Sequence, residues 1–278
     1  MKNASDVSDR SRLFRLLMIG DVVGKPGKSI LTEHLPRIRE ERLVDFVVIN
    51  AENAKDGSGI TPEIYNTLIE CGVDCITLGD HAFRSKSIYP MLNDPTSRLV
   101  RPANFPAEAP GRGYALIESV GANGRPATLV GVTSLLGRVF MQNPIDNPFS
   151  VADKMLVRIS EARVKILDFH AEATSEAQAM GRYLDGKFTA VLGTHTHVAT
   201  ADECILPGGT AYQTDVGMTG PFHSIIGRNV EPVLDYFKTG RQTLFDVAKR
   251  DVRINGVFVD VNLGTGKAVA IDRFDFRA

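Results

Sequence analysis

The sequence has little cysteine, and this argues against one large class of small folds. It contains three cysteines in 278 residues, Cys71, Cys75 and Cys204. An odd count without a framework spacing is not typical of a disulfide-stapled protein. Cys71 and Cys75 flank an expected junction between a helix and a strand, and no histidine lies near them in the sequence. We therefore expect these two thiols to be buried apolar groups rather than metal ligands.

The sequence also lacks a charge excess and a long apolar run. Its 32 basic residues nearly balance its 33 acidic residues, and no basic block stands out. This argues against an extended nucleic-acid groove, although a small nucleotide could still bind. No apolar run could span a membrane, and residues 1–12 lack the apolar core of a signal peptide. We expect a cytoplasmic protein with a mobile tail at residues 1–12 and a single domain at residues 13–278.

What the sequence does have is a repeated pattern of short apolar runs, each followed at once by a side chain that can bind a metal ion. Buried strands are typically brief apolar runs of this kind. In an open α/β sheet, ligands bind just beyond the carboxyl ends of the strands. We therefore expect these polar side chains to gather on one rim. The runs, with the polar residues that end them, are 16–21, 46–53, 75–81, 164–170 and 190–197.

Helix signals separate these strands, and in the second half of the sequence short strands joined by turns become more frequent. A glycine and proline loop at 24–27 precedes an amphipathic stretch at 30–42, and Thr61 followed by Pro62 marks a helix start. The first half of the sequence favours parallel strands, and the second half is rich in hairpins. This pattern predicts two sheets packed face to face, with helices outside. The later strands are expected at 114–120, 128–134, 257–263 and 268–274, and the later helices at 150–162 and 174–183.

Histidine use indicates the chemistry. Four of the six histidines follow the expected strands, together with several oxygen ligands. Imidazole with carboxylate suits manganese, iron, zinc, nickel or cobalt. The candidates exceed the need of one ion and fit two ions bridged by a carboxylate. In an extended segment, His195 and His197 would point to the same side, so that one strand end could serve both ions. The candidates are Asp21, Glu52, Asn53, Asp80, His81, His170, His195 and His197.

One segment resembles a phosphate-binding loop and has to be weighed against this interpretation. Gly27, Lys28 and Ser29 follow a strand and open a helix, as in nucleoside triphosphatases. That motif requires a glycine five positions before Gly27, where this sequence has Val22. Pro26 also lies inside the loop. We therefore set the triphosphatase interpretation aside.

Seven segments together resemble the YmdB branch of the calcineurin-like metallophosphoesterases, and the resemblance extends from about residue 14 to residue 274. It implies an α/β protein with a four-layer α/β/β/α metallophosphoesterase sandwich and two mixed sheets. It also implies a binuclear metal centre and phosphodiesterase activity on cyclic nucleotides, notably 2′,3′-cyclic ones. A homo-oligomer is expected as well. The segments are 16–24, 50–54, 79–81, 101–106, 168–175, 193–197 and 214–221.

Carried over by position, the resemblance implies two metal ions, divalent or of mixed valence, with iron or manganese expected ahead of zinc. Glu52 would bridge the ions, and His81 would face the leaving group without binding metal. The ligands of the first ion would be Asp21, Asn53 and His197, and those of the second Asp80, His170 and His195.

Three positions depart from the patterns that carry the resemblance. Val23 stands where the wider superfamily has the histidine of Asp-x-His, and Asn53 would take over its role, as in the YmdB branch. Asp80 stands where the branch usually has asparagine, which adds a negative charge to the site. Arg84 replaces an acidic residue of the branch, so that any role of that acid is lost.

The implied reaction is in-line attack on phosphorus by a metal-bridging hydroxide, with His81 as the general acid. Asp168 would either orient an imidazole or cap a turn. Substrate choice is expected to lie in the loops at 101–112, 136–149 and 218–230. The residues expected to contact a nucleotide or another small phosphodiester are Arg101, Asn104, Thr219 and His223.

Two other functions remain open at this point. The same scaffold could carry a different di-metal phosphoesterase, such as a phosphomonoesterase or a ribonuclease. Alternatively, the chain could be a regulatory protein whose metal site is structural. A panel of cyclic nucleotides, monoesters and single-stranded RNA would separate these functions.

Overall fold

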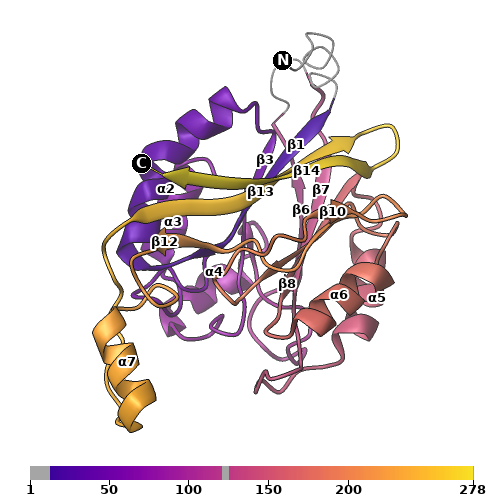
Figure 1. Cartoon of the computed structure of the whole chain (residues 1–278). Coiled ribbons are helices and arrows are strands. Elements are labelled where there is room, and N and C mark those ends of the chain that lie inside the picture. The colour runs from indigo at the N-terminus through magenta and orange to yellow at the C-terminus, as the bar shows by residue number, and fades with distance from the viewer. Residues whose placement is uncertain (1–12, 121–124, 278) are drawn as a thin grey trace.

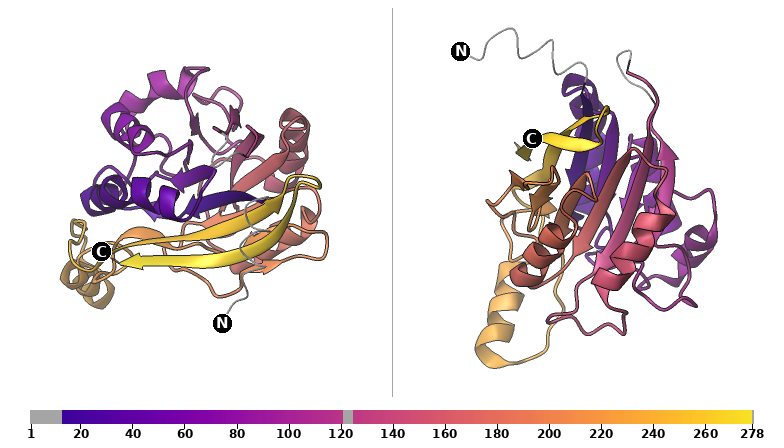
Figure 2. Two further views of the ribbon diagram at one scale, coloured as in Figure 1. Left: turned by 90° about the horizontal axis from the view of Figure 1, so that it is seen from above. Right: turned by 90° about the vertical axis from the view of Figure 1, so that its right-hand side faces the viewer.

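Two β-sheets pack face to face, and helices cover their outer faces (Figures 1 and 2). The computed structural model describes residues 13–120 and 125–277. The predicted tail at residues 1–12 lies outside the described residues. Within them, the predicted α/β/β/α sandwich with two mixed sheets is confirmed. No helix in this part of the chain is long and apolar enough to cross a membrane.

The first sheet is mixed because one strand, β13, runs antiparallel to its neighbours β1, β12 and β14, whereas the other neighbouring strands pair in parallel. Its strand order is β2-β12-β13-β1-β3-β4-β5, with β14 paired to β13. Strand β1 is parallel to β3 and antiparallel to β13, so both ends of the chain build one sheet. The strands are β1 (Phe14–Ile19), β2 (Asp21–Val22), β3 (Phe46–Asn50), β4 (Cys75–Thr77), β5 (Leu99–Val100), β12 (Met218–Pro221), β13 (Val252–Asn262) and β14 (Lys267–Arg277).

The second sheet has the order β10-β11-β9-β8-β7-β6. Its four central strands are parallel, and its two edge strands are antiparallel to their neighbours. The carboxyl ends of its central strands therefore share one edge. The strands are β6 (Tyr114–Glu118), β7 (Leu129–Leu136), β8 (Val164–His170), β9 (Ala190–Thr194), β10 (Cys204–Ile205) and β11 (Ala211–Gln213).

Helices pack on the outer face of each sheet, and one helix stands apart. Figure 1 shows α7 projecting from the body of the protein. Helix α5 packs on β7 and α6 on β9, whereas α2 packs beside β12 and β13. The helices are α2 (Gly24–Glu41), α3 (Pro62–Glu70), the 3₁₀ turn η1 (Lys86–Ile88), α4 (Tyr89–Asn93), α5 (Pro148–Arg158), α6 (Thr174–Tyr183) and α7 (Val230–Thr239).

Side-chain alternation along the strands creates the layers. In β1, Leu17 and Ile19 pack towards the helices, whereas Leu16 and Met18 pack against the second sheet. Phe169 of β8 belongs to a third apolar cluster, under α5 and α6. Strand side chains alternate between faces, so a strand apolar on both faces must lie between two layers. Each such side chain, when fully buried, stabilises the fold by roughly 1.5–3 kcal/mol.

The helix predictions were right for the start of α3 and for both ends of α6. Thr61 caps α3 by accepting a hydrogen bond from Ile64 N at 3.3 Å, and α6 has its predicted bounds. The loop predicted at 24–27 is wrong, because α2 already begins at Gly24. Pro26 is tolerated there because the first helical turn does not need its missing N–H. The sequence prediction did not identify α7, nor strands as short as β2.

The prediction of a buried thiol is confirmed for Cys75 and only partly for Cys71. Cys75 is buried between the sheets, and Cys71 is half-buried beside the first apolar cluster. Burial raises the pKa of both thiols, that of Cys71 to about 11. Both thiols therefore stay protonated near neutral pH and pack as apolar groups.

Candidate metal centre

Five strand ends from the two sheets meet at one rim, and each contributes at least one polar side chain. β1 leads through Gly20 into β2, where Asp21 lies. His170 is the last residue of β8, and the other side chains come from the loops that follow β3, β4 and β9. The residues in those loops are Glu52, Asn53, Asp80, His81, His195 and His197.

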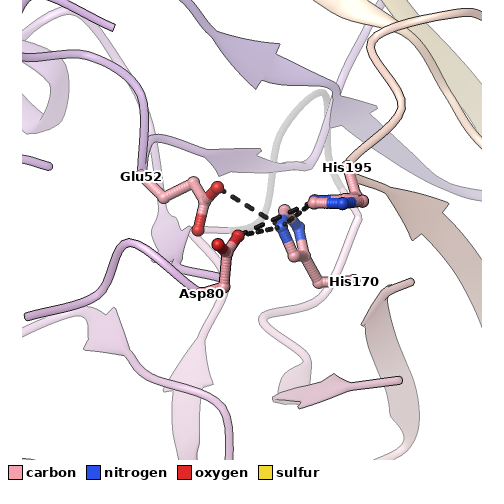
Figure 3. Close-up of side chains that lie close together, drawn as sticks. All are labelled: Glu52, Asp80, His170 and His195. Carbon is pink, nitrogen blue, oxygen red and sulfur yellow. Dashed lines mark hydrogen bonds and ion pairs between the residues drawn. The ribbon is translucent and has the colours of Figure 1, made fainter. Parts of the chain in front are cut away.

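Four of these residues form a tight group, which Figure 3 shows. Glu52, Asp80, His170 and His195 each offer a ligand atom, and these atoms lie within 4.8 Å of one another. His170 Nε2 is 3.2 Å from Asp80 Oδ1 and 3.3 Å from Glu52 Oε1. His195 Nδ1 is 2.9 Å from His170 Nε2. Two carboxylates and two imidazoles directed at one point form a donor set that suits a transition metal.

A second group lies beside the first and shares Glu52 with it. Asn53 Nδ2 is 3.5 Å from Asp21 Oδ1, 3.2 Å from His197 Nε2 and 3.3 Å from Glu52 Oε1. His197 Nε2 is 3.9 Å from Asp21 Oδ1. As a metal ligand, Asn53 would use its amide oxygen. A rotation of the side-chain amide by about 180° would exchange Nδ2 and Oδ1 and bring that oxygen towards Asp21 and His197.

The backbone at Gly79 leaves the room that the first group needs. A Cβ atom at this position would overlap Glu52 Oε2 and His170 Nε2. Any side chain larger than hydrogen would therefore displace two of the candidate ligands. The close approach of backbone to ligand atoms, together with the mixed nitrogen and oxygen donors, fits a bound cation.

The segment after β9 bends sharply, which corrects one expectation. His195 and His197 have φ angles of 114° and 64°, so the predicted extended segment with both rings on one side is wrong. The bend is held by hydrogen bonds from His195 N to Asp21 Oδ2 at 3.0 Å and from Thr196 N to Asp215 Oδ2 at 2.8 Å. Such strained backbone persists only where its surroundings over-determine it. Each imidazole reaches a different ligand group because the chain turns between them.

A buried chain of hydrogen bonds orients His170. Its Nδ1 lies 2.8 Å from Thr194 Oγ1, and this hydroxyl donates to Asp168 Oδ1 at 2.7 Å. Thr77 and Asn50 also donate to Asp168, at 2.5 and 3.0 Å. Burial raises the pKa of Asp168 to about 6 despite these donors and the charge of His170. This series of hydrogen bonds holds a proton on His170 Nδ1 and directs Nε2 towards the ligand group, so Asp168 acts on the imidazole through Thr194.

His81 lies at the edge of both groups and is partly open to solvent. Its backbone N donates to Glu52 Oε2 at 2.9 Å, and its Nδ1 is 2.8 Å from Asn53 Oδ1. Its Nε2 is 3.7 Å from Asp80 Oδ2, and its side chain is 25% exposed. Burial works against the charged imidazole, but the hydrogen bond and charge of Glu52 and the charge of Asp80 raise the pKa of His81. The ring is therefore held ready to carry a proton.

The charges of the centre compensate one another. Burial alone would raise the pKa of Glu52, but His170 and His81 hold that pKa well below its usual range. The pKa of His170 is raised well above its usual value, because Glu52 and Asp80 outweigh the effect of burial. A divalent cation would compete with these imidazole protons for the same donor atoms.

Three of the four side chains expected to contact substrate, those of Arg101, Asn104 and Thr219, form hydrogen bonds to backbone carbonyls outside the two ligand groups. Arg101 is buried and donates to the carbonyls of Pro102, Ala109 and Pro110, within its own loop. The contact of all four side chains with substrate stays a prediction. The other three are Asn104, which bonds both the N and the O of Leu136, Thr219, which is buried in β12, and His223, which is exposed.

Sequence reasoning missed several residues that support the ligands. Thr194 directly precedes His195, and Glu172 follows His170 by two positions, so adjacency to a ligand was the available signal. Asp215 carried no such signal, because only the folded chain brings it to Thr196. Burial, then the charge of Asp21, raise the pKa of Asp215 to about 8.

Two face-to-face mixed sheets with carboxylates and imidazoles at their common rim define a metallophosphoesterase fold. The sequence matches the family described as YmdB-like protein over residues 17–274. The chain therefore belongs to the YmdB-like protein family.

Known relatives agree with this assignment. A Bacillus subtilis (strain 168) protein named 2′,3′-cyclic-nucleotide 2′-phosphodiesterase is 46% identical over 260 residues, which is 93% of this chain and 96% of the relative. The crystal structure of a hypothetical protein from Thermus thermophilus has a TM-score of 0.86 and 41% identity, over 95% of this chain and 99% of the other. That of a novel phosphatase from Mycoplasma pneumoniae has a TM-score of 0.86 and 35% identity, over 95% and 94%.

Proposed function

We propose that this protein is a metal-dependent phosphodiesterase that hydrolyses 2′,3′-cyclic nucleotides. The observation that carries the proposal is the convergence of Glu52, Asp80, His170 and His195, whose ligand atoms lie within 4.8 Å of one another. The name of the similar Bacillus subtilis enzyme supplies the substrate class. The supporting chain His170–Thr194–Asp168 suits a site that must hold its ligands in one orientation.

Two cations fit the two neighbouring donor groups. Glu52 would serve both ions, since its Oε1 is 3.3 Å from both His170 Nε2 and Asn53 Nδ2. Bound divalent or mixed-valence ions would supply Lewis acidity and activate water at neutral pH. Iron or manganese suits the mixed imidazole and carboxylate donors, and zinc is the third candidate. The remaining ligands would be Asp21 and His197 on one side, and Asp80 and His195 on the other.

His81 would supply the proton that the reaction requires. As water attacks phosphorus and the bond to the ribose oxygen breaks, the proton on His81 Nε2 would pass to that oxygen. Nδ1 faces Glu52 Oε1 at 3.3 Å, whereas Nε2 lies at 3.7 Å from Asp80 on a partly exposed ring. A positioned general acid typically contributes about 10²–10⁴-fold to turnover.

The loops around the rim would select the substrate. Arg101 holds the loop at 101–111 through its carbonyls, and Asn104 ties that loop to β7. These two side chains would act on the substrate by fixing the loop. The backbone at Thr219 and the exposed side chain of His223 would contact the substrate directly.

The experiment is a substrate panel assayed with protein purified without chelators, whose metal content is measured on the same sample. The panel holds a 2′,3′-cyclic nucleotide, a 3′,5′-cyclic nucleotide, p-nitrophenyl phosphate and single-stranded RNA, each with added Mn²⁺. We expect the 2′,3′-cyclic nucleotide to be hydrolysed fastest, and chelation to abolish the reaction. Asp21→Asn is the matched low-activity control. Faster hydrolysis of the monoester, or unchanged activity after chelation, would refute the proposal.

Domain organisation, oligomeric state and location complete the proposal. Residues 13–278 would form one domain, because β13 and β14 complete the sheet that β1 begins. Exposed apolar side chains at Leu234, Phe237 and Leu244 on and after α7 suit a homo-oligomer, which light scattering of the purified protein would test. The free thiols suit a reducing cytoplasm.

A further inference from the structure

His195 is held on three sides by groups from two segments of the chain, which are residues 170–172 and the strand β2. Its Nδ1 faces the ligand group and lies 2.9 Å from His170 Nε2. Its backbone N donates to Asp21 Oδ2 at 3.0 Å. On the outer side of the ring, its Nε2 lies 3.2 Å from Oε2 of Glu172. Glu172 is in the loop between β8 and α6, and its side chain is 49% exposed.

The contact with Glu172 decides which nitrogen of His195 carries the proton. A neutral imidazole has one N–H donor and one acceptor nitrogen, and a carboxylate can only accept. Glu172 therefore places the proton on Nε2 and leaves the lone pair on Nδ1. That lone pair faces the group formed by Glu52, Asp80 and His170.

The neighbouring imidazole is oriented by the opposite nitrogen. His170 Nδ1 forms a hydrogen bond with Thr194, and its Nε2 faces the ligand group. The two rings meet edge to face, with centroids 4.7 Å apart (Figure 3). Each ring has a polar partner on its far nitrogen, which is buried for His170 and half-exposed for His195.

We propose that Glu172 is a positioning residue that fixes the tautomer and ring orientation of His195 for metal binding. This inference rests on the metal centre of the proposed function. His195 needs such support because its φ of 114° lies in a strained region. The loop that carries Glu172 is itself tied to the end of β9, since Ala171 N donates to Thr194 O at 3.2 Å. Glu172 and His195 therefore keep a defined separation.

A purely structural role predicts a different response from a positioning role. Because Glu172 is half-exposed, its removal leaves no buried polar group without a partner, and we expect the stability of the metal-free protein to be unchanged. Glu176 shows the contrast within the same region. Its buried carboxylate accepts hydrogen bonds from Arg138 N and Val139 N, and its loss would destabilise the fold itself.

The test uses the full chain, stripped of metal and titrated with Mn²⁺ by calorimetry, as wild type, Glu172→Ala and Glu172→Gln. Glutamine keeps an acceptor oxygen, whereas alanine removes it. Loss of a group that orients a metal-binding histidine typically costs about 10–100-fold in affinity, and we expect this for Glu172→Ala at one of the two ions. Glu172→Gln should recover most of that loss. Glu161→Ala removes an exposed glutamate before β8 and should match the wild type.

Two readouts besides calorimetry make the inference falsifiable. The visible absorption of the Co²⁺-loaded protein reports ligand geometry and should change in Glu172→Ala but not in Glu161→Ala. The melting temperature of each metal-free variant should equal that of the wild type. Wild-type affinity and an unchanged spectrum in Glu172→Ala would overturn the inference, as would a Glu172→Gln variant as weak as the alanine variant. If the wild type itself binds no metal, the proposed function fails as well.

Discussion

Nδ1 of His170 lies 2.8 Å from Oγ1 of Thr194, at a point where neither side chain touches water. The hydroxyl donates a hydrogen bond to Asp168, so this buried carboxylate on β8 orients, through Thr194, an imidazole two residues further along the same strand. Successive residues of a strand point to opposite faces, whereas residues two apart share one face. Asp168 and His170 therefore lie on the same side of the second sheet, and Thr194 of β9 bridges them.

Thr194→Val should show how much the hydroxyl that links His170 to Asp168 contributes, because it removes the hydroxyl and keeps the shape of the side chain. Valine keeps the shape of threonine but leaves His170 Nδ1 and Asp168 without their shared partner. We expect metal affinity to fall by about 10–100-fold and the free energy of unfolding to fall by about 1–3 kcal/mol. Calorimetry and urea unfolding measure the two effects. Thr67→Val, on the half-exposed face of α3, is the control, and equal behaviour of the two variants would contradict the account.

Gly79→Ala should lower the metal content of the centre although it replaces none of the candidate ligands. Its Cβ would overlap Glu52 Oε2 and His170 Nε2, which is not possible for unbonded atoms. Both side chains would have to move, so we expect bound metal to fall below half of the wild-type content. Inductively coupled plasma mass spectrometry measures that content. Gly264→Ala in the β13–β14 turn is the control, and an alanine at 79 that retains full metal would show that the ligands lie elsewhere.

His81→Ala should lower turnover and leave the metals in place. Without the general acid, kcat should fall by about 10²–10⁴-fold on a cyclic nucleotide. Metal content should stay at the wild-type value, because His81 is not expected to be a ligand. His34→Ala, on the outer helix α2, serves as a control for loss of an imidazole. Loss of metal from the His81 variant would instead identify this residue as a ligand.

Asp80→Asn tests the extra negative charge of this chain. Asp80 Oδ1 is 3.2 Å from His170 Nε2, so the substitution keeps a ligand oxygen but removes a charge. We expect the variant to hold cations less tightly and bind phosphate anions more tightly, with a changed preference among metals. Metal competition and phosphate inhibition constants measure both effects. Equal metal content and equal kinetics in the two proteins would refute this prediction.

Asp215 should make the stability of the metal-free protein depend on pH. Its pKa is raised from 3.8 to about 8, first by burial and then by the charge of Asp21. Between these values the folded state holds more protons than the unfolded state, so stability decreases as pH rises. The slope from one such group is at most about 1.4 kcal/mol per pH unit.

Asp215→Asn removes that proton and should flatten the dependence. The measurement is urea unfolding of chelator-treated protein at about pH 5 and about pH 7.5. The absolute stability of the variant should be lower, since Asp215 accepts from Thr196 N and Gly217 N, but the difference between the two pH values should shrink. An unchanged difference would mean that Asp215 is ionised throughout this range.

The strand ends and their ligands could be predicted from the sequence because the signals are local. A short apolar run predicts a buried strand, and the polar residue after it must then lie at the end of that strand. Thr61 with Pro62 likewise marked the start of α3 correctly. The family resemblance added which of these residues would share an ion. These inferences need only neighbours in the sequence and a motif that the chain carries itself.

The partners of those ligands depend on the tertiary structure, because they come from segments far apart in the chain. Glu172 meets His195 only when β8 and β9 lie side by side, and Asp215 meets Thr196 only after the chain has passed through β10 and β11. The same holds for Arg101, whose donors all go to its own folded loop. Hydrogen bonds depend on distance and direction in space, which a linear pattern does not contain. The sequence alone therefore determined which side chains could bind metal, and only the packing of the two sheets decided how each one is held.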